Sequence, residues 1–552
     1  MRLSRLGSLH QCRLSFMRVL TRRMAREGWR FSRPLFDIDG TGVGRAVYAV
    51  ERGDRVYSLV AFAHDLPDAL RSDRVIAEAW DATFALFDGV PTRADLDRLA
   101  ETVPLQEAGR LSERELVLSR ANRSGRLWRH VVEALASGRQ PDNDTVGRVG
   151  YLMRTTAVYA SGKFGTADRD RIRDRPELKA PFQAEMLTVY LIRTFVRDLV
   201  NHMGRAAGGD GAVPLDPALA RRLGIGNSTG LGMAPFIVNH PVLFNNWIAA
   251  REAAIASVRA VERATNGELA LFRDLLGRCH IHVARWRSDN PVQTRKLAGL
   301  RRDLDVLTGY AEADLTPDHL PWDRLMCWSE SALGDEGQEL IASLILEPYA
   351  DRVDALVDTM SDDAVDSGLI DGRVPVGTLR RQIGETFGWA LAIDWTRRRN
   401  QARVWYVSEE KLEPRLGERF EEPVAAYEQP LGPARDAVRA HGDLSRWPDD
   451  APVARFLLAH PEHRHVVRRF QMCRRAPYGE IRDNTIGADL MPIDMLRSKL
   501  AFFGATHFDP RSDRWVRISM YAGAPHPEAL TVSNADRWIY PDPDGPVASV
   551  GT

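Results

Sequence analysis

A glycine-rich stretch near the middle of the chain carries the residue types best suited to hold a small polar ligand. Between Gly224 and Gly232 there are four glycines in nine residues, with three short polar residues among them. Glycine leaves backbone N–H groups accessible, and such groups can surround a carboxylate, a phosphate or a carbonyl. We therefore predict a ligand-binding loop here, with four substrate-binding residues: Gly226, Asn227, Ser228 and Thr229.

The residues that follow add amide and imidazole groups among aromatic side chains. Three asparagines and a histidine lie close in sequence to Phe244 and Trp247. Buried amide and imidazole groups need hydrogen-bond partners, which either the backbone at a tight helix corner or a bound molecule can supply. We predict that a bound molecule is the partner of these amide and imidazole groups. His240 is then a predicted catalytic residue, and the predicted substrate-binding residues are Asn239, Asn245 and Asn246.

Lys163 and Tyr478 complete the set of candidate site residues. Lys163 stands between two glycines at the predicted exit of a helix, where its ammonium group could bind an anion or, if desolvated, act as a base. The alternative for Lys163 is a solvated side chain at a helix end. Tyr478 lies in a polar stretch that could close over a pocket. With His240 or Lys163 transferring a proton, we predict a lyase or isomerase that acts on a small polar or anionic metabolite, with an unknown cofactor requirement.

Two nucleotide-binding motifs are excluded by their context. The dinucleotide fingerprint requires G-x-G-x-x-G between a strand and a helix, but the residues before Gly224 have a helical pattern and the glycine spacing differs. Lys163 is not followed by serine or threonine, so it does not belong to a phosphate-binding loop of the G-x-x-x-x-G-K-[ST] type.

The histidine clusters do not have the spacing of a metal site. His280 and His282 fall on a predicted helix, where residues two apart point about 200° away from each other. His460, His463 and His465 begin a new helical turn after a proline, and we interpret them as a solvated cluster. We therefore assign no metal ligand.

A short motif near the N-terminus offers a different chemistry. The residues Phe36-Asp37-Ile38-Asp39-Gly40-Thr41 resemble the first motif of haloacid-dehalogenase-type phosphatases. In that family one aspartate is the nucleophile and the second a general acid, so the resemblance implies magnesium-dependent phosphate ester hydrolysis by Asp37 and Asp39. The family motif ends a buried parallel strand and precedes a helix, whereas here another strand pattern follows. The alternative is a hairpin turn rich in Asp and Gly.

The elements that must position these residues are mainly helical. Strand-forming residues separated by turns predict an antiparallel meander over 31–66, with a hairpin turn at Gly53-Asp54. Another strand is predicted at 515–521. Apolar residues at helical spacing are clearest in 180–203, where they occupy one face. Helices are also predicted over 75–87, 93–102, 120–137, 145–160, 268–288, 292–309, 336–360, 377–393 and 451–473. We predict an α+β fold that is mainly α with smaller β elements.

A chain of 552 residues is too long for one ordinary core, so we expect several domains. A large central helical domain would lie between an N-terminal antiparallel meander and a C-terminal α+β part. The expected divisions are a basic, poorly ordered extension (1–26), a β-meander element (27–90), the central helical domain (91–360), the C-terminal α+β domain (361–530) and a poorly ordered tail (531–552).

Charge and cysteine content restrict the partners and the compartment. Residues 1–26 hold seven arginines and no acid, so the rest of this formally neutral chain has an excess of seven acidic residues, which argues against a general nucleic-acid surface. The four cysteines are too few and too widely spaced for a disulfide framework, which favours a reducing cytoplasm. No apolar run reaches membrane-spanning length. We expect a cytoplasmic protein with a small-molecule substrate and without nucleic-acid or membrane partners.

A non-catalytic function stays open beside the enzyme. The glycine stretch could be only a tight corner, and the aromatic surfaces could be subunit interfaces. The protein would then be an oligomeric interaction or assembly protein, and a homo-oligomer is compatible with either function.

Overall fold

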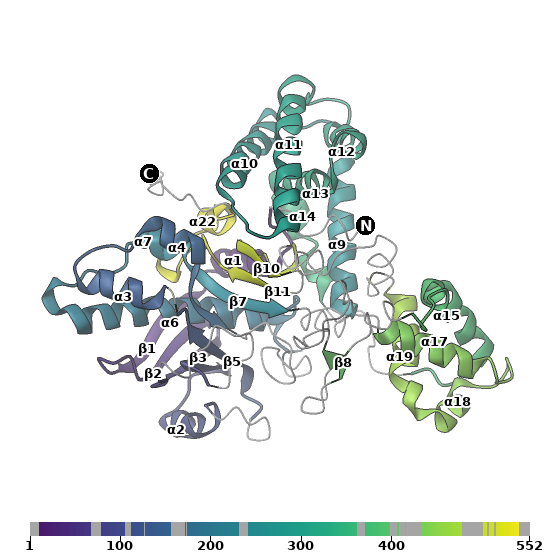
Figure 1. Cartoon of the computed structure of the whole chain (residues 1–552), viewed down its shortest axis with the longest axis horizontal. Helices are drawn as coiled ribbons and strands as arrows, with labels where there is room; N and C mark the ends of the chain where they lie inside the picture. Colours follow the sequence, from purple (N-terminus) through teal and green to yellow (C-terminus); the bar gives the residue numbers. More distant parts are fainter. Residues whose placement is uncertain are drawn as a thin grey trace.

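The computed structural model describes fifteen segments of the chain. They are residues 10–67, 79–104, 112–125, 127–155, 172, 174–230, 241–361, 370–397, 406–407, 414–415, 432–476, 478, 501–504, 507–512 and 515–539. Figure 1 shows a sheet flanked by helices, a helical region beside it and a separate small group of helices. The coarse α+β prediction is therefore confirmed.

A nine-stranded sheet forms the centre of the fold, in the order β1-β2-β3-β4-β5-β6-β7-β11-β10. Neighbouring strands are antiparallel except for the parallel pair β6 and β7. The strands are β1 (Arg30–Ile38), β2 (Gly44–Arg52), β3 (Arg55–Ala63), β4 (Ala82–Asp88), β5 (Glu115–Arg123), β6 (Tyr151–Thr155), β7 (Gly224–Gly230), β10 (His507–Ser512) and β11 (Trp515–Met520). The short strands β8 (Tyr406–Val407) and β9 (Pro414–Arg415) pair only with each other.

The predicted meander is confirmed for the first three strands. Arg52 pairs with Arg55 across the β2–β3 turn, and Gly53 has a φ of +60°, a value that glycine adopts without strain. Side chains alternate between the two faces of these strands. In β2, Tyr48 packs in the main core, whereas Val47 packs in a smaller core on the opposite face.

The expected helix at 75–87 is wrong in its described part, which contains β4, and the expected helix at 120–137 is wrong at its start, which belongs to β5, but is confirmed over α3 (Trp128–Ala136). In β4, Phe84 and Leu86 belong to the main core, while Ala85 and Phe87 belong to the smaller core on the other face. Because both faces of this strand are buried, its sequence is a continuous apolar run without alternation, and such a run resembles a buried helix. The described part of the expected helix at 145–160 likewise divides into α4 (Asn143–Val149) and β6.

Helices cover both faces of the sheet. The long helix α6 (Gln183–Gly208) contacts strands β2 to β7, and α2 (Arg93–Thr102) contributes Leu99 to the small core on the other face. The Thr92–Asp95 capping box at the start of α2 forms. The prediction of α6 is confirmed, but its first half is buried on all sides, not on one face. The remaining elements near the sheet are α3 (Trp128–Ala136), η4 (Pro176–Leu178), η5 (Gly209–Gly211), α7 (Pro217–Arg222) and η12 (Pro527–Ala529).

Residues 10–26 are ordered and buried, which corrects the expected N-terminal extension for its described part. Helix α1 (Phe16–Arg26) inserts Met17 and Leu20 into the main core. Its arginines meet carboxylates from distant segments: Arg18 binds Glu347, and Arg22 donates to Asp354 at 2.8 Å. The acids that neutralise these arginines lie more than 300 residues further along the chain. The local sequence therefore contains basic residues without acidic ones, a pattern typical of a basic tail.

The C-terminal segment also differs from the expected tail in its described part. Helix α22 (Val532–Arg537) packs against α1, and the next residue, Trp538, is 1% exposed. The sheet itself crosses the expected domain boundaries at residues 90 and 360, because it joins the N-terminal strands to β4–β7 and to β10–β11.

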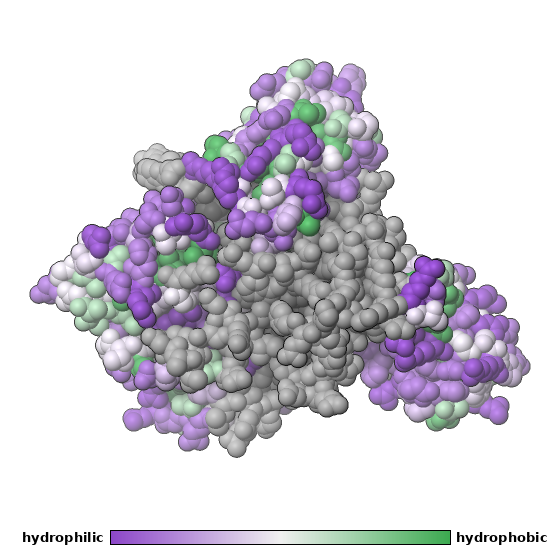
Figure 2. Space-filling model, viewed as in Figure 1, coloured by the Kyte–Doolittle hydropathy of each residue, from purple (hydrophilic) through white to green (hydrophobic). Residues whose placement is uncertain are grey.

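A helical region follows β7 in the chain and shares the main core. Its α9 (Pro241–Arg259) crosses toward the sheet, and the other helices gather around its outer part in Figure 1. They are α10 (Asn266–Arg285), α11 (Pro291–Ala313), α12 (Pro321–Ala332), α13 (Asp335–Leu344), η7 (Glu347–Tyr349), α14 (Ala350–Asp354) and η8 (Val357–Met360). Figure 2 shows a mainly hydrophilic surface over α10 and α11, with apolar residues scattered on it.

A second hydrophobic core holds a small helical body together. Phe387, Phe456 and Phe470 belong to this core, which is separate from the main one. The body consists of α15 (Val376–Leu391), α17 (Gly432–Leu444), α18 (Val453–Ala459), η10 (Pro461–His463) and α19 (Arg464–Arg475).

Candidate functional site

The glycine-rich stretch forms strand β7 in the interior of the sheet, which corrects the expected loop for residues 224–230. Glycine is required at two of these positions because atoms of neighbouring strands lie where a Cβ atom would be. A Cβ atom on Gly226 would lie 2.5 Å from Cγ of Tyr151, and one on Gly224 would lie 2.3 Å from the carbonyl oxygen of Met520. These glycines therefore allow the neighbouring strands to approach, and no ligand is needed to account for them.

Asn227 is the predicted site residue with the most informative environment. Its side chain is 1% exposed, and Nδ2 donates a hydrogen bond to the carbonyl oxygen of Thr155 at 3.3 Å. A carbonyl oxygen can only accept a hydrogen bond. This bond therefore distinguishes the nitrogen from the oxygen of the Asn227 amide. Oδ1 accepts no hydrogen bond from any residue within the described segments. An unpaired buried acceptor costs about 1–3 kcal/mol, so a hydrogen-bond donor placed next to this oxygen would be stabilising.

The carboxyl ends of strands β6 and β7 lie on one edge of the sheet. The pair is parallel, with Arg154 opposite Gly226. Their carboxyl ends therefore lie on the same edge, the position where open sheets with parallel strands bind ligands. The chain leaves β6 after Thr155 toward Lys163, and leaves β7 after Gly230 toward Asn239 and His240. These three predicted residues lie outside the described segments.

Ser228 and Thr229 lie in β7 by their backbone. Ser228 is paired with Arg517 and Thr229 with Val516 of strand β11. Their side chains are outside the described part of the structure.

Asn245 and Asn246 lie in the first turns of α9, and the chain itself supplies their hydrogen-bond partners. Asn245 Nδ2 donates to Asn246 Oδ1 at 3.2 Å, and Asn246 Nδ2 donates to the carbonyl oxygen of Ser361 at 2.7 Å. Both side chains are 8% exposed. This arrangement matches the helix-corner alternative, in which the amides hold the backbone.

The backbone of Tyr478 contacts the same first turns of α9. Its N–H donates to Asn245 Oδ1 at 3.0 Å, while its side chain is 38% exposed. The structure therefore brings Asn245, Asn246 and Tyr478 together, and Asn227 is held by a different group, the end of β6.

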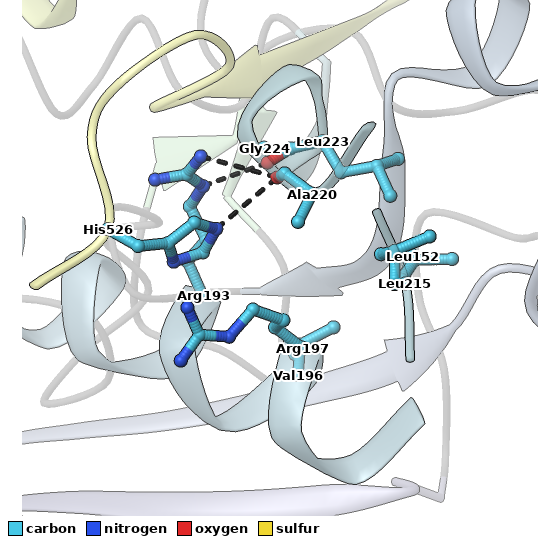
Figure 3. A pocket seen from close by; sticks show the side chains of 9 residues that line it. All are labelled: Leu152, Arg193, Val196, Arg197, Leu215, Ala220, Leu223, Gly224 and His526. Carbon is cyan, nitrogen blue, oxygen red and sulfur yellow. Dashed lines mark hydrogen bonds between the residues drawn. The ribbon is translucent and has the colours of Figure 1, made fainter. Parts of the chain in front are cut away.

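A buried arginine of the long helix α6 lines a small hollow. Arg193 of α6 is 3% exposed and donates to the carbonyl oxygens of Leu223 at 2.8 Å and Ala524 at 2.9 Å. Figure 3 shows it beside His526, whose Nε2 atom lies 3.3 Å from the carbonyl oxygen of Ala220. Burial lowers the pKa of Arg193 to about 9 and lowers the pKa of His526 well below its usual value.

The hollow itself has room for about one water molecule. It is lined mainly by apolar side chains and by Arg193, Arg197 and His526. A space of this size excludes a metabolite. We interpret Arg193 as a clamp that joins α6, α7 and the segment after β11.

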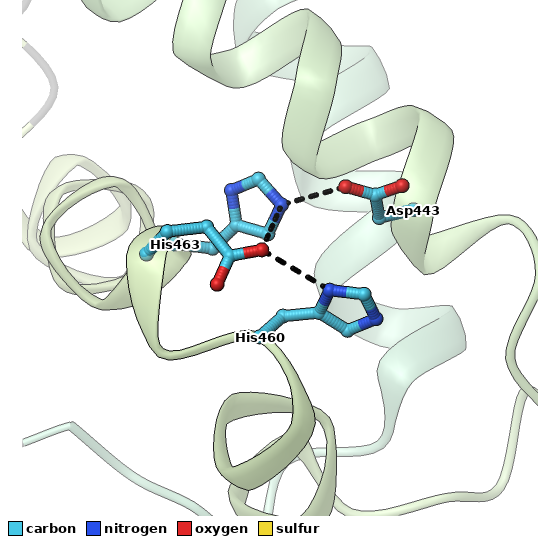
Figure 4. A group of neighbouring side chains, drawn as sticks. Asp443, His460 and His463 are labelled. Atoms are coloured by element: carbon cyan, nitrogen blue, oxygen red, sulfur yellow. Dashed lines mark hydrogen bonds and ion pairs between the residues drawn. The ribbon is translucent and has the colours of Figure 1, made fainter.

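A cluster of potential metal ligands lies in the small helical body (Figure 4). Asp443, His460, Glu462 and His463 each offer one ligand atom, and these atoms all lie within 4.8 Å of one another. The sequence pattern revealed the histidines but not Asp443, which is 17 residues before His460 and reaches the cluster only through the packing of α17 against the α18–α19 corner.

The Asp37–Asp39 motif adopts the hairpin-turn alternative. Asp39 Oδ1 accepts from the backbone N–H groups of Thr41 at 2.9 Å and Val43 at 3.0 Å. The side chain of Asp37 is 75% exposed. Strand β1 is an antiparallel edge strand, whereas the phosphatase motif ends a buried parallel strand, so the resemblance does not extend to the fold around it.

Comparisons of the chain with protein-family models, curated proteins and solved structures found no significant match. Among the described helices, none combines the length and apolar character needed to cross a membrane.

Proposed function

We propose that the protein is an enzyme that acts on a small polar or anionic metabolite by proton transfer, as a lyase or isomerase. The site is at the carboxyl ends of β6 and β7. The observation that carries this proposal is the buried amide of Asn227, whose Oδ1 atom has no donor among the described residues.

The orientation of this amide defines the chemistry of the ligand. Since Oδ1 is an acceptor, the ligand must present a hydrogen-bond donor to it, such as a hydroxyl or an amine. Lys163 would bind an anionic group of the same molecule, and His240 would move the proton. Both residues belong to segments that start from the two parallel strands next to Asn227.

The amides of α9 have a supporting role in this proposal. Asn245 and Asn246 hold Tyr478 and Ser361 to the first turns of α9. They thereby fix the helix that follows the His240 segment, and they need not touch the substrate.

A thermal-shift screen tests the proposal directly. Hydroxycarboxylic acids, amino acids and phosphorylated hydroxy compounds are added one at a time to the full-length protein. We expect at least one compound to raise the Tm of the native protein and to leave the Tm of Asn227→Ala unchanged. Asn266→Ala, which alters an exposed asparagine at the start of α10, should respond like the native protein.

Turnover of the active compound then separates binding from catalysis. His240→Ala and Lys163→Ala should each reduce turnover by at least about a hundredfold, the usual contribution of a general acid or base. Circular dichroism establishes that the variants are folded. Unchanged turnover in both folded variants would contradict the proton-transfer assignment, and an oligomer that binds none of the compounds would favour the assembly alternative.

A further inference from the structure

The ligand atoms of Asp443, His460, Glu462 and His463 lie close together, all within 4.8 Å of one another. Asp443 Oδ2 lies 2.8 Å from His463 Nε2, and Glu462 Oε1 lies 3.2 Å from His460 Nδ1 and 3.9 Å from His463 Nε2. Around a tetrahedral ion with bonds of about 2.0–2.1 Å, ligand atoms are separated by about 3.3 Å. The observed separations lie on both sides of that value, so small side-chain rotations would suffice to bind an ion.

Two hydrogen bonds join these four groups in pairs, His463 with Asp443 and His460 with Glu462. The Glu462 oxygen lies 3.9 Å from His463 Nε2, beyond hydrogen-bond distance, so the two pairs meet without a hydrogen bond between them. Two carboxylates and two imidazoles converge from three consecutive elements. A divalent cation would balance the two negative charges and would bind both imidazole nitrogens at once.

The surroundings hold the ligands in place without an ion. The ring of His463 is stacked on Phe456 at 5.7 Å with an interplanar angle of 2°, and the ring of His460 lies 6.2 Å from that of Trp447. Arg446 Nη1 donates to Asp443 Oδ1 at 3.2 Å, which leaves the other carboxylate oxygen for the cluster. Supporting contacts of this kind orient metal ligands in proteins.

We propose that Asp443, His460, Glu462 and His463 form a Zn²⁺ site that ties the end of α17 to the corner between α18 and α19. Two imidazole nitrogens with two carboxylate oxygens suit Zn²⁺, whereas Mg²⁺ and Ca²⁺ prefer oxygen ligands throughout. The ion would stabilise the small helical body, and this proposal is independent of the proposed enzyme function.

The side chains leave an entry path for the ion. His463 is 7% exposed, but Asp443, His460 and Glu462 are 26%, 30% and 60% exposed. An ion can therefore reach the cluster from solvent, and chelators can remove it.

Calorimetric titration of the full-length protein with Zn²⁺ alone, after treatment with EDTA, tests the site. We expect one Zn²⁺ per chain and an increase in Tm. Because removal of His463 could unfold its surroundings, the main variants are Asp443→Asn and His460→Ala, with circular dichroism as the folding check. Each should weaken Zn²⁺ binding by at least about tenfold.

His465→Ala is the matched control, because His465 is an exposed histidine two residues after the cluster. It should bind Zn²⁺ as tightly as the native protein. The site is refuted if the native protein binds no Zn²⁺, if the two variants bind as tightly as the native protein, or if His465→Ala loses as much affinity as they do.

Discussion

Two buried polar regions of this protein are completed in different ways. Around α1, the buried carboxylates of Glu347 and Asp354 accept hydrogen bonds from several arginines of the same chain. In β7, the amide oxygen of Asn227 has no donor among the described residues. Buried polar groups are nearly always paired in proteins. In the first region the carboxylate acceptors are paired within the fold, although some donors, such as Arg18 Nε and Arg22 Nη1, have no partner among the described residues. In the second region the unpaired atom is the acceptor itself.

The largest expected effect is on the first region. Glu347→Gln removes the charge opposite Arg18 while preserving the size of the side chain. Breaking a buried ion pair from one side costs about 3–5 kcal/mol, because the other charge stays buried. Urea unfolding should show a loss of this size. Glu51→Gln, in an exposed pair with Arg30, should cost no more than about 1 kcal/mol. Equal losses would mean that burial does not distinguish the two pairs.

The same carboxylate predicts a pH dependence. Burial alone would raise the pKa of Glu347, but the charge and hydrogen bonds of Arg18, together with His10, outweigh burial and hold the pKa well below its usual value. The stabilisation is therefore complete above the unfolded pKa of about 4.3, and is lost as the pH falls through the folded-state pKa. The Tm difference between native protein and Glu347→Gln should be constant from pH 5 to 7 and should shrink below about pH 4. A Tm difference that grows as the pH falls would mean that folding raises the pKa of Glu347 instead of lowering it.

A smaller effect distinguishes packing from ligand binding in β7. Gly226→Ala would place a methyl group against the ring of Tyr151, and overpacking of this kind costs about 1–3 kcal/mol. Gly277→Ala is the matched control, since a Cβ at this exposed position of α10 meets nothing within 4 Å. Alanine should stabilise that helix by up to about 1 kcal/mol. If Gly226→Ala left the free energy of unfolding unchanged, the packing explanation would be wrong and a ligand-binding role for Gly226 would be favoured.

The smallest effect on stability is expected at Asn227. Asn227→Ala removes one long hydrogen bond to Thr155 and also one unpaired buried oxygen, so the two contributions largely cancel. Unfolding measurements should differ from the native protein by less than about 1 kcal/mol. A loss above 3 kcal/mol would show that the amide is part of the structural core.

Sequence patterns identified elements that have a turn or capping motif at one end, or apolar residues at helical spacing. The β2–β3 hairpin, α2 and α6 belong to this group. Strands β4 and β5 were missed because both of their faces are buried, so their apolar residues do not alternate. The helix at 180–203 was expected to be apolar on one face, but the first half of α6, which includes Arg193, is buried on all sides.

Long-range pairing explains the remaining errors. The acids that hold α1, the strand β11 beside β7 and the aspartate beside His463 are all distant in sequence from the groups they complete. Local composition therefore predicted a basic tail and a loop, and it gave no sign of the aspartate beside the histidine cluster. At the candidate site, sequence reasoning selected Asn227 from its neighbouring glycines, although those glycines serve sheet packing.

The most direct test of the central claim is the affinity of Asn227→Ala for the compound that gives the largest thermal shift with the native protein. Calorimetric titration of both proteins measures it. If Asn227 Oδ1 accepts a hydrogen bond from the ligand, the variant should bind about tenfold or more weakly, equivalent to at least about 1.4 kcal/mol. Equal affinities in two folded proteins would show that the ligand binds elsewhere.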